Sequence, residues 1–128
     1  MTTTYAVLLP GDERPWAQAD DETRARVYAR HEEFQRLLAE RGHEMTGGAE
    51  LAHSATARTV RGARGAVTVT EGPYAETVEQ LTGFYLVRTD DLDDLLDLCG
   101  LLTGGDAVEV RAVVPGPDAG TTDEERAR

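Results

Sequence analysis

The residues best suited to chemistry in this chain are one histidine and a group of carboxylates. His31 lies on the apolar face of a stretch whose hydrophobic residues repeat with helical spacing. Imidazole exchanges protons near neutral pH, so a histidine presented to a cleft can act as a general acid or base. Glu71 and Glu76 stand in the segment TEGPYAETVEQLTGFYLV, residues 70–87, together with Tyr74. Since a carboxylate from this segment could orient the imidazole, we predict His31, Glu71 and Glu76 as the catalytic candidates.

Each of these residues also has a purely structural interpretation. A histidine on an apolar helix face is commonly a hydrogen-bonded core or interface residue. Gly72 and Pro73 favour a turn, because glycine is conformationally free and proline fixes φ near about −65°. The loop would then only lead the chain into the next strand, with Glu71 accepting backbone N–H bonds. On the functional interpretation the loop edges a cleft and presents Glu71, Tyr74 or Glu76 to a ligand.

A second wall of the same cleft is predicted in the loop after the first strand. This loop, PGDERPW, spans residues 10–16 and contains Asp12, Glu13 and Trp16. Trp16 would provide an apolar surface and Asp12 a carboxylate, so we predict that both contact a ligand, together with Tyr74. Asp12 is a further candidate partner for the imidazole. The structural alternative is a loop with a packed indole.

The sequence lacks the motifs of metal, nucleotide or serine-nucleophile chemistry. The spacing of His31, His43 and His53 matches no zinc site, which needs three or four converging ligands. There is no glycine-rich phosphate loop and no Gly-x-Ser-x-Gly elbow. The one cysteine, Cys99, falls on the apolar face of a predicted helix, which favours a buried thiol over an exposed nucleophile. We therefore predict no metal and no cofactor.

Charge and hydropathy narrow the range of partners. The 128 residues carry a formal net charge of −11, which repels phosphate backbones, so no nucleic-acid partner is expected. No apolar run approaches the ~20 residues of a membrane span. The N-terminus has no basic region followed by a long apolar one. These features predict a cytoplasmic protein without membrane contact, while a basic partner protein stays compatible with the charge.

Hydrophobic periodicity predicts six strands and two helices. Apolar alternation or short apolar runs predict strands at residues 4–9, 43–51, 55–61, 66–70, 83–87 and 107–113. Helical spacing predicts one helix from about residue 20 to 41 and a second after residue 90. The second helix would be capped by Thr89 or Asp90. Its apolar stripe would consist of Leu92, Leu95, Leu96, Cys99 and Leu102.

This order of elements predicts an α+β fold. The pattern β-α-β, hairpin, β-α-β fits a ferredoxin-like two-layer sandwich, that is, a split βαβ arrangement with an inserted β-hairpin. Residues 1–114 would form the one domain, and residues 115–128 a disordered tail without an apolar anchor. Two helices cover only one face of such a sheet. A second copy of the chain is the simplest cover for the other face, so we predict a homodimer.

The segment EGPYAETVEQLTGFYLV, residues 71–87, resembles the signature of the DGPF proteins. That signature starts Asp-Gly-Pro-Phe and continues through Ala-Glu-Thr-Lys-Glu to a Gly-Phe strand. GDE at 11–13, FQRLLAERG at 34–42 and DDLDDLLDL at 90–98 are also similar, and the likeness spans about residues 4–113. The chain is thus identified as a DGPF-type member of the YCII-related superfamily. It departs from the signature at Glu71, Tyr74 and Val78, where the family has Asp, Phe and Lys.

The resemblance implies a dimeric α+β barrel and leaves the activity open. Most DGPF proteins have no assigned reaction, and many are encoded beside extracytoplasmic-function sigma factors. The superfamily includes small-molecule enzymes, among them a dehalogenase of chlorinated muconolactones. In its YCII branch a helical histidine is proposed as half of a His–Asp pair. His31 resembles that residue, but its aspartate has no counterpart here.

Two classes of function follow as expectations. The first is a small-molecule-binding protein that performs cofactor-independent acid–base chemistry, as an isomerase, lyase or dehalogenase does. The alternative is a non-catalytic accessory or regulatory protein in an extracytoplasmic-function sigma factor pathway. A ligand-sensing module without turnover is a third interpretation.

Overall fold

The structure is a computed structural model that describes residues 2–116. Residues 117–128, where the sequence predicts most of a disordered tail, lie outside the described residues. None of the helices within residues 2–116 is both long and apolar enough to cross a membrane.

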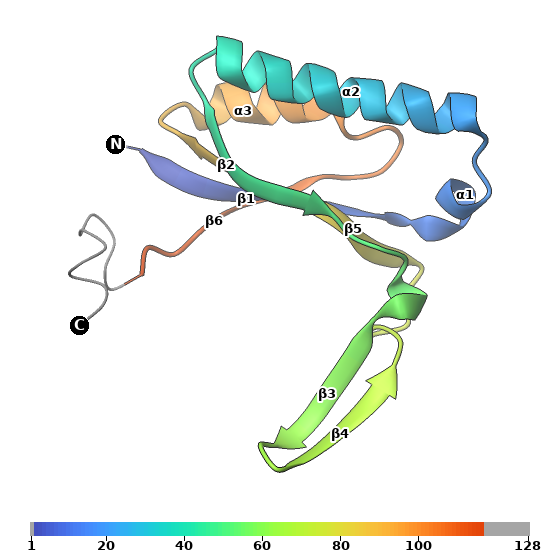
Figure 1. The fold of residues 1–128 in the computed structure, drawn as a ribbon. Helices are drawn as coiled ribbons and strands as arrows, with labels where there is room; N and C mark the ends of the chain where they lie inside the picture. The colour runs from blue at the N-terminus through green and yellow to red at the C-terminus, as the bar shows by residue number, and fades with distance from the viewer. Residues whose placement is uncertain (1, 117–128) are drawn as a thin grey trace.

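A four-stranded antiparallel sheet forms one layer of the molecule (Figure 1). Its strands are β1 (Thr3–Asp12), β2 (Glu44–Glu50), β5 (Glu79–Thr89) and β6 (Glu109–Ala112), in the order β2-β5-β1-β6. This order is that of the ferredoxin-like sandwich, which confirms the predicted fold class. The run GFYLV lies in β5 between two neighbouring strands, as its continuous apolar character predicts.

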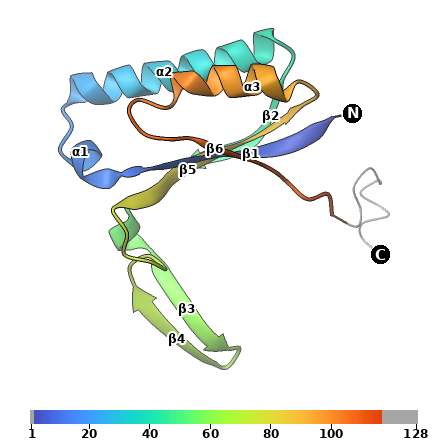
Figure 2. The same cartoon turned by 180° about the vertical axis from the view of Figure 1, so that it is seen from behind.

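Two helices form the second layer. The helices α2 (Asp21–Glu40) and α3 (Leu92–Leu98) lie side by side over one face of the sheet (Figures 1 and 2). Helix α2 begins after Asp20, whose carboxylate accepts a hydrogen bond from the backbone N–H of Thr23 at 2.8 Å. A short helix, α1 (Glu13–Ala17), follows β1, where the sequence predicts only a loop.

The core lies between the sheet and the two helices. Its buried hydrophobic residues are Val7, Phe34, Leu38, Tyr85, Val87, Leu95, Leu98 and Cys99. Cys99 is buried as predicted, and burial raises the pKa of its thiol to about 11. A thiol with so high a pKa stays protonated and is a poor nucleophile at neutral pH.

The prediction for the second helix is wrong in two details. Its N-cap is Asp91, which accepts a hydrogen bond from the N–H of Asp94 at 3.1 Å, in place of Thr89 or Asp90. Leu96 is 45% exposed, and Leu98 is buried instead. The buried stripe differs from the predicted one because Leu95, Leu98 and Cys99 share one face at i, i+3, i+4 spacing. Helix α3 ends at Leu98 and continues as a 3₁₀ helix, η2 (Cys99–Leu101).

Within residues 2–116, no helix lies on the other face of the sheet (Figure 2). Leu8 pairs with Phe84, and Ala6 with Leu86, on the face opposite Val7 and Tyr85. The strands β3 (Arg58–Ala63) and β4 (Ala66–Glu71) form the predicted hairpin. They are a separate two-stranded sheet that projects from the side opposite the helices (Figure 1).

Replacing Gly48 with alanine should destabilise the fold, because β2 approaches β5 closely at this glycine. Gly48 has φ of +150°, and a Cβ there would lie 2.7 Å from the carbonyl oxygen of Phe84. We expect the free energy of unfolding to fall by roughly 1–3 kcal/mol in chemical denaturation. Gly100→Ala is the matched control, since its Cβ would meet no atom within 4 Å. Equal stability of the two variants would contradict this.

Candidate functional site

A cavity of about 1190 Å³ lies between the start of α2, strand β2 and the loop before β6. We call it the His31 cavity. Its aromatic and polar wall includes Trp16, Tyr28, His31, Gln35, Glu50 and Tyr85. The middle turns of α2 supply part of this wall, because residues 28, 31 and 35 share one helix face at i, i+3, i+7 spacing.

His31 forms a hydrogen-bonded pair with Tyr85. Its Nδ1 lies 2.7 Å from Tyr85 Oη, and Gln35 Nε2 donates to the same oxygen at 3.3 Å. The rings of His31 and Tyr85 have centroids 5.8 Å apart. Tyr85 is itself held by the core, where its ring packs against Phe34. The imidazole is therefore oriented by a tyrosine that the sheet and the helix layer fix in place.

Burial keeps the His31 imidazole neutral. Burial lowers its pKa; the Glu50 carboxylate opposes this by favouring the charged ring, and Arg30 adds to the lowering. Burial also raises the pKa of Tyr85, although the hydrogen bond from Gln35 acts in the opposite direction. The pair at neutral pH is thus a neutral imidazole beside a protonated phenol. Such an imidazole is ready to accept a proton.

The lowered pKa of His31 predicts a pH-dependent stability difference. The unfolded chain takes up a proton on this residue near pH 6.5, but the folded protein does so only at lower pH. This residue therefore makes stability fall as the pH drops below about 6.5. We expect the stability advantage of the wild type over His31→Gln to be smaller at pH 5 than at pH 7.5 in urea unfolding. An advantage that is the same at both pH values would contradict the neutral state of His31.

A glutamate and two aromatic rings complete the wall opposite His31. Glu50 accepts hydrogen bonds from Tyr28 Oη at 3.0 and 3.2 Å, and these bonds raise the pKa of Tyr28. Trp16 meets Tyr28 edge-on, with ring centroids 5.5 Å apart. Arg24 lies over the Trp16 ring at 5.3 Å. Trp16 is therefore both a cavity wall, as predicted, and a packed indole.

A second, smaller cavity of about 560 Å³ lies at the base of the hairpin, and we call it the loop cavity. Its lining includes Glu13, Ser54, Glu71, Glu76 and Gln80. The Glu13 carboxylate accepts hydrogen bonds from Ser54 N at 2.8 Å and Ser54 Oγ at 2.5 Å.

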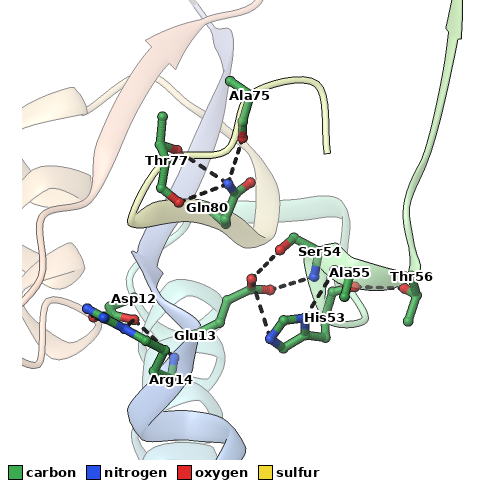
Figure 3. Close-up of polar contacts among 10 residues, drawn as sticks. All are labelled: Asp12, Glu13, Arg14, His53, Ser54, Ala55, Thr56, Ala75, Thr77 and Gln80. Atoms are coloured by element: carbon green, nitrogen blue, oxygen red, sulfur yellow. Dashed lines mark hydrogen bonds and ion pairs between the residues drawn. The ribbon is translucent and has the colours of Figure 1, made fainter. Parts of the chain in front are cut away.

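The loop between β4 and β5, residues 72–78, forms one wall of the loop cavity, and we call it the signature loop. There Gln80 Nε2 donates to the carbonyl oxygen of Ala75 at 2.8 Å and to that of Thr77 at 3.1 Å (Figure 3). Gln80 thus fixes the loop that carries Glu76.

Asp12 lines both cavities. Its carboxylate accepts from the backbone N–H of Arg14 at 3.0 Å and pairs with the Arg14 guanidinium at 2.5 Å. Hydrogen bonds from the Arg14 side chain, then from its backbone, hold the pKa of Asp12 at about 2. Asp12, Glu13 and His53 line both cavities, so the two spaces share a wall.

The structure brings together only some of the residues predicted for the site. His31, Asp12 and Trp16 line the His31 cavity. Glu71 and Glu76 line the loop cavity instead, and Glu71 lies 3.9 Å from the guanidinium of Arg58. Tyr74 is 84% exposed and lines neither cavity. The carboxylate that acts on the charge of His31 is Glu50, and the group that hydrogen-bonds to it is Tyr85.

Sequence reasoning missed Gln35, Glu50, Tyr28 and Tyr85. The helical spacing of Tyr28 and Gln35 relative to His31 was a usable signal for two of them. No local signal places Tyr85 beside His31, because the residues are 54 positions apart.

A second histidine, His43, has a structural role. The His43 side chain is 1% exposed, and its Nδ1 lies 2.7 Å from Thr89 Oγ1. Its Nε2 lies 2.6 Å from Asp94 Oδ2, and Asp94 also pairs with Arg41. This His–Asp pair ties the beginning of β2 to the end of β5 and to α3, and it lines neither of the two cavities.

The fold and these sites belong to a known family. Residues 4–115 match the model of the YCII-related domain. The chain is therefore a member of the YCII-related family, as the signature predicts.

A protein of Rhizobium meliloti (strain 1021), described as uncharacterized protein R00369, is 40% identical over 96 residues. The match covers 73% of this chain and 74% of that protein.

Proposed function

We propose that this protein binds a small organic molecule in the His31 cavity and transfers a proton on it without a cofactor. The observation that carries the proposal is the 2.7 Å contact between His31 Nδ1 and Tyr85 Oη on the cavity wall. A neutral, oriented imidazole on the wall of a cavity lined by apolar and aromatic side chains has the features that general acid–base catalysis requires.

In such a step His31 takes up the proton while Tyr85 holds the other ring nitrogen. When Nδ1 carries the proton and donates to Tyr85 Oη, the lone pair of Nε2 is free to accept a proton from a C–H group of the ligand. The resulting imidazolium returns that proton at another carbon, which is an isomerisation. If the carbanion instead expels a leaving group as an anion with its bonding electrons, a double bond forms, and the imidazolium releases its proton to solvent; this step is an elimination, as in a lyase or dehalogenase.

The other predicted site residues have supporting roles in this proposal. Trp16 forms an apolar side of the ligand pocket, and Asp12 a polar one. Glu71 and Glu76 contact the part of a ligand that extends into the loop cavity, and they do not orient His31. Tyr74, exposed on the signature loop, becomes a ligand contact only if the loop moves.

Proton exchange in D₂O tests the proposal directly. The probes are small compounds with acidic C–H groups, namely unsaturated lactones, halogenated lactones and β-keto esters. Loss of the C–H signal in the proton NMR spectrum reports exchange without requiring a known product. Exchange faster than in protein-free buffer for at least one compound is the expected result. The same rate with and without protein across the panel would overturn the catalytic proposal.

We also propose that the working form is a homodimer. The support is the sheet face of Leu8, Phe84 and Leu86, which no described element of the chain covers. An apolar sheet face exposed to water is costly, and a second copy packed face to face removes it from solvent. Sedimentation analysis tests this, and a chain that is monomeric at every concentration would refute it.

A further inference from the structure

The segment between β2 and β5 leaves many of its apolar side chains exposed. Among the described residues, twelve large hydrophobic side chains are exposed, and seven of these lie within residues 51–81, that is, in this segment and the first three residues of β5. They are Leu51, Val60, Val67, Val69, Tyr74, Val78 and Leu81. None of the described core residues comes from this segment. When exposed apolar side chains are concentrated in one segment, that segment is a candidate contact surface.

The β3–β4 hairpin within this segment is amphipathic. Its register pairs Val60 with Val69 and places Val67 on the same face. These valines are 59%, 54% and 50% exposed, respectively. The opposite face carries Thr59, Arg61 and their threonine partners. A two-stranded hairpin is marginally stable in water unless its apolar face packs on something.

We propose that this hairpin is an arm that packs its valine face on a second copy of this chain. The proposal rests on the homodimer proposed above. The hairpin projects from the side of the sheet that bears the uncovered apolar face (Figures 1 and 2). A symmetric dimer built sheet to sheet brings the body of each copy beside the arm of the other.

Charge identifies the second copy as the partner of the arm. Of the 13 basic residues in the chain, three lie in residues 58–71, but only one of the 24 acidic residues does. The hairpin is therefore basic, and the rest of the chain is strongly acidic. Within residues 2–116, Arg61 and Arg64 make no ion pair. Arg61 lies on the face opposite Val60 and Val69, and Arg64 lies in the turn. The acidic body of a second copy therefore attracts the basic arm through its overall charge and not through contacts of these two side chains at the valine face.

Dimer dissociation constants of three variant pairs, measured by analytical ultracentrifugation, test the arm. Val60→Thr with Val69→Thr removes apolar surface but keeps the shape and strand preference of the side chains. Arg61→Glu with Arg64→Glu reverses the charge of the arm. The matched control is Arg26→Glu with Arg36→Glu, which changes the net charge equally on exposed positions of α2. We expect each arm variant to weaken the dimer by roughly tenfold or more, and the control by less than about twofold.

The outcomes separate the arm from the proposals on which it rests. A wild-type chain that never dimerises overturns both the homodimer and the arm. A dimer of unchanged affinity in both arm variants overturns the arm alone. Hydrogen exchange gives a second readout, because amides of β3 and β4 should be protected in the dimer and lose protection on dilution. Amides that exchange equally fast in both forms would also overturn the arm. The D₂O assay for His31 is independent of either result.

Discussion

Replacing His31 with glutamine should slow protein-dependent proton exchange on a responsive compound by roughly 100- to 10 000-fold. The reason is that glutamine fills a similar space but has no group that accepts and returns a proton near neutral pH. His31 is partly buried on the cavity wall, so the variant should keep its fold. Initial exchange rates in D₂O at equal protein concentration measure the effect. A His31→Gln rate within about threefold of wild type would exclude His31 as the base.

Two further variants distinguish catalysis from binding. Tyr85→Phe keeps the ring that packs on Phe34 but removes the hydroxyl that holds His31 Nδ1. Because orienting partners of catalytic groups typically contribute 10- to 100-fold, we expect a loss of about that size in kcat and a displaced pH profile. Glu76 lines the loop cavity, so Glu76→Gln should change KM and leave kcat unchanged. If the Tyr85→Phe variant had an unchanged kcat, the tyrosine would have only a packing role.

Local sequence patterns predicted the layers of the fold well. The alternation in residues 4–9 and the apolar run at 83–87 became the paired strands β1 and β5. The stripe that includes Phe34 and Leu38 became the buried face of α2. These elements were predictable because burial of one face imposes a period on the sequence. Leu96 shows the limit, since Leu96 and Leu98 are equally apolar, and which of the two faces the core depends on how α3 packs on the sheet.

The site was predictable residue by residue but not as an assembly. His31, Asp12 and Trp16 were each recognised as chemically or physically suited to a cavity, and they line the same one. The signature carboxylates Glu71 and Glu76 line another. Their place depends on the hairpin, which leaves the sheet at an angle that no local pattern specifies. Tyr85 reaches His31 only through the packing of α2 on β5.

The buried His43 should contribute more to stability than either of the other histidines. Its two ring nitrogens contact Thr89 Oγ1 and Asp94 Oδ2, and the backbone N–H of Asp91 donates to Thr89 Oγ1 at 3.0 Å. The ring thus links the Thr89 hydroxyl on one side to the Asp94 carboxylate on the other, and Nε2 donates to that carboxylate. Each polar side-chain atom in this series of hydrogen bonds around His43 has a partner, as buried polar groups require.

His43→Ala should therefore lower the free energy of unfolding by roughly 2–4 kcal/mol, because it empties a buried position and removes one hydrogen-bond partner from both a buried hydroxyl and a nearly buried carboxylate. His53→Ala is the control, because the His53 side chain is 49% exposed and should contribute less than about 1 kcal/mol. A double-mutant cycle with Asp94→Ala isolates the His–Asp contact, and we expect a coupling energy of about 1–3 kcal/mol. If the two substitutions were additive in urea unfolding, the pair would not be a stabilising link between β2 and α3. The loss would then come only from the space left in the core.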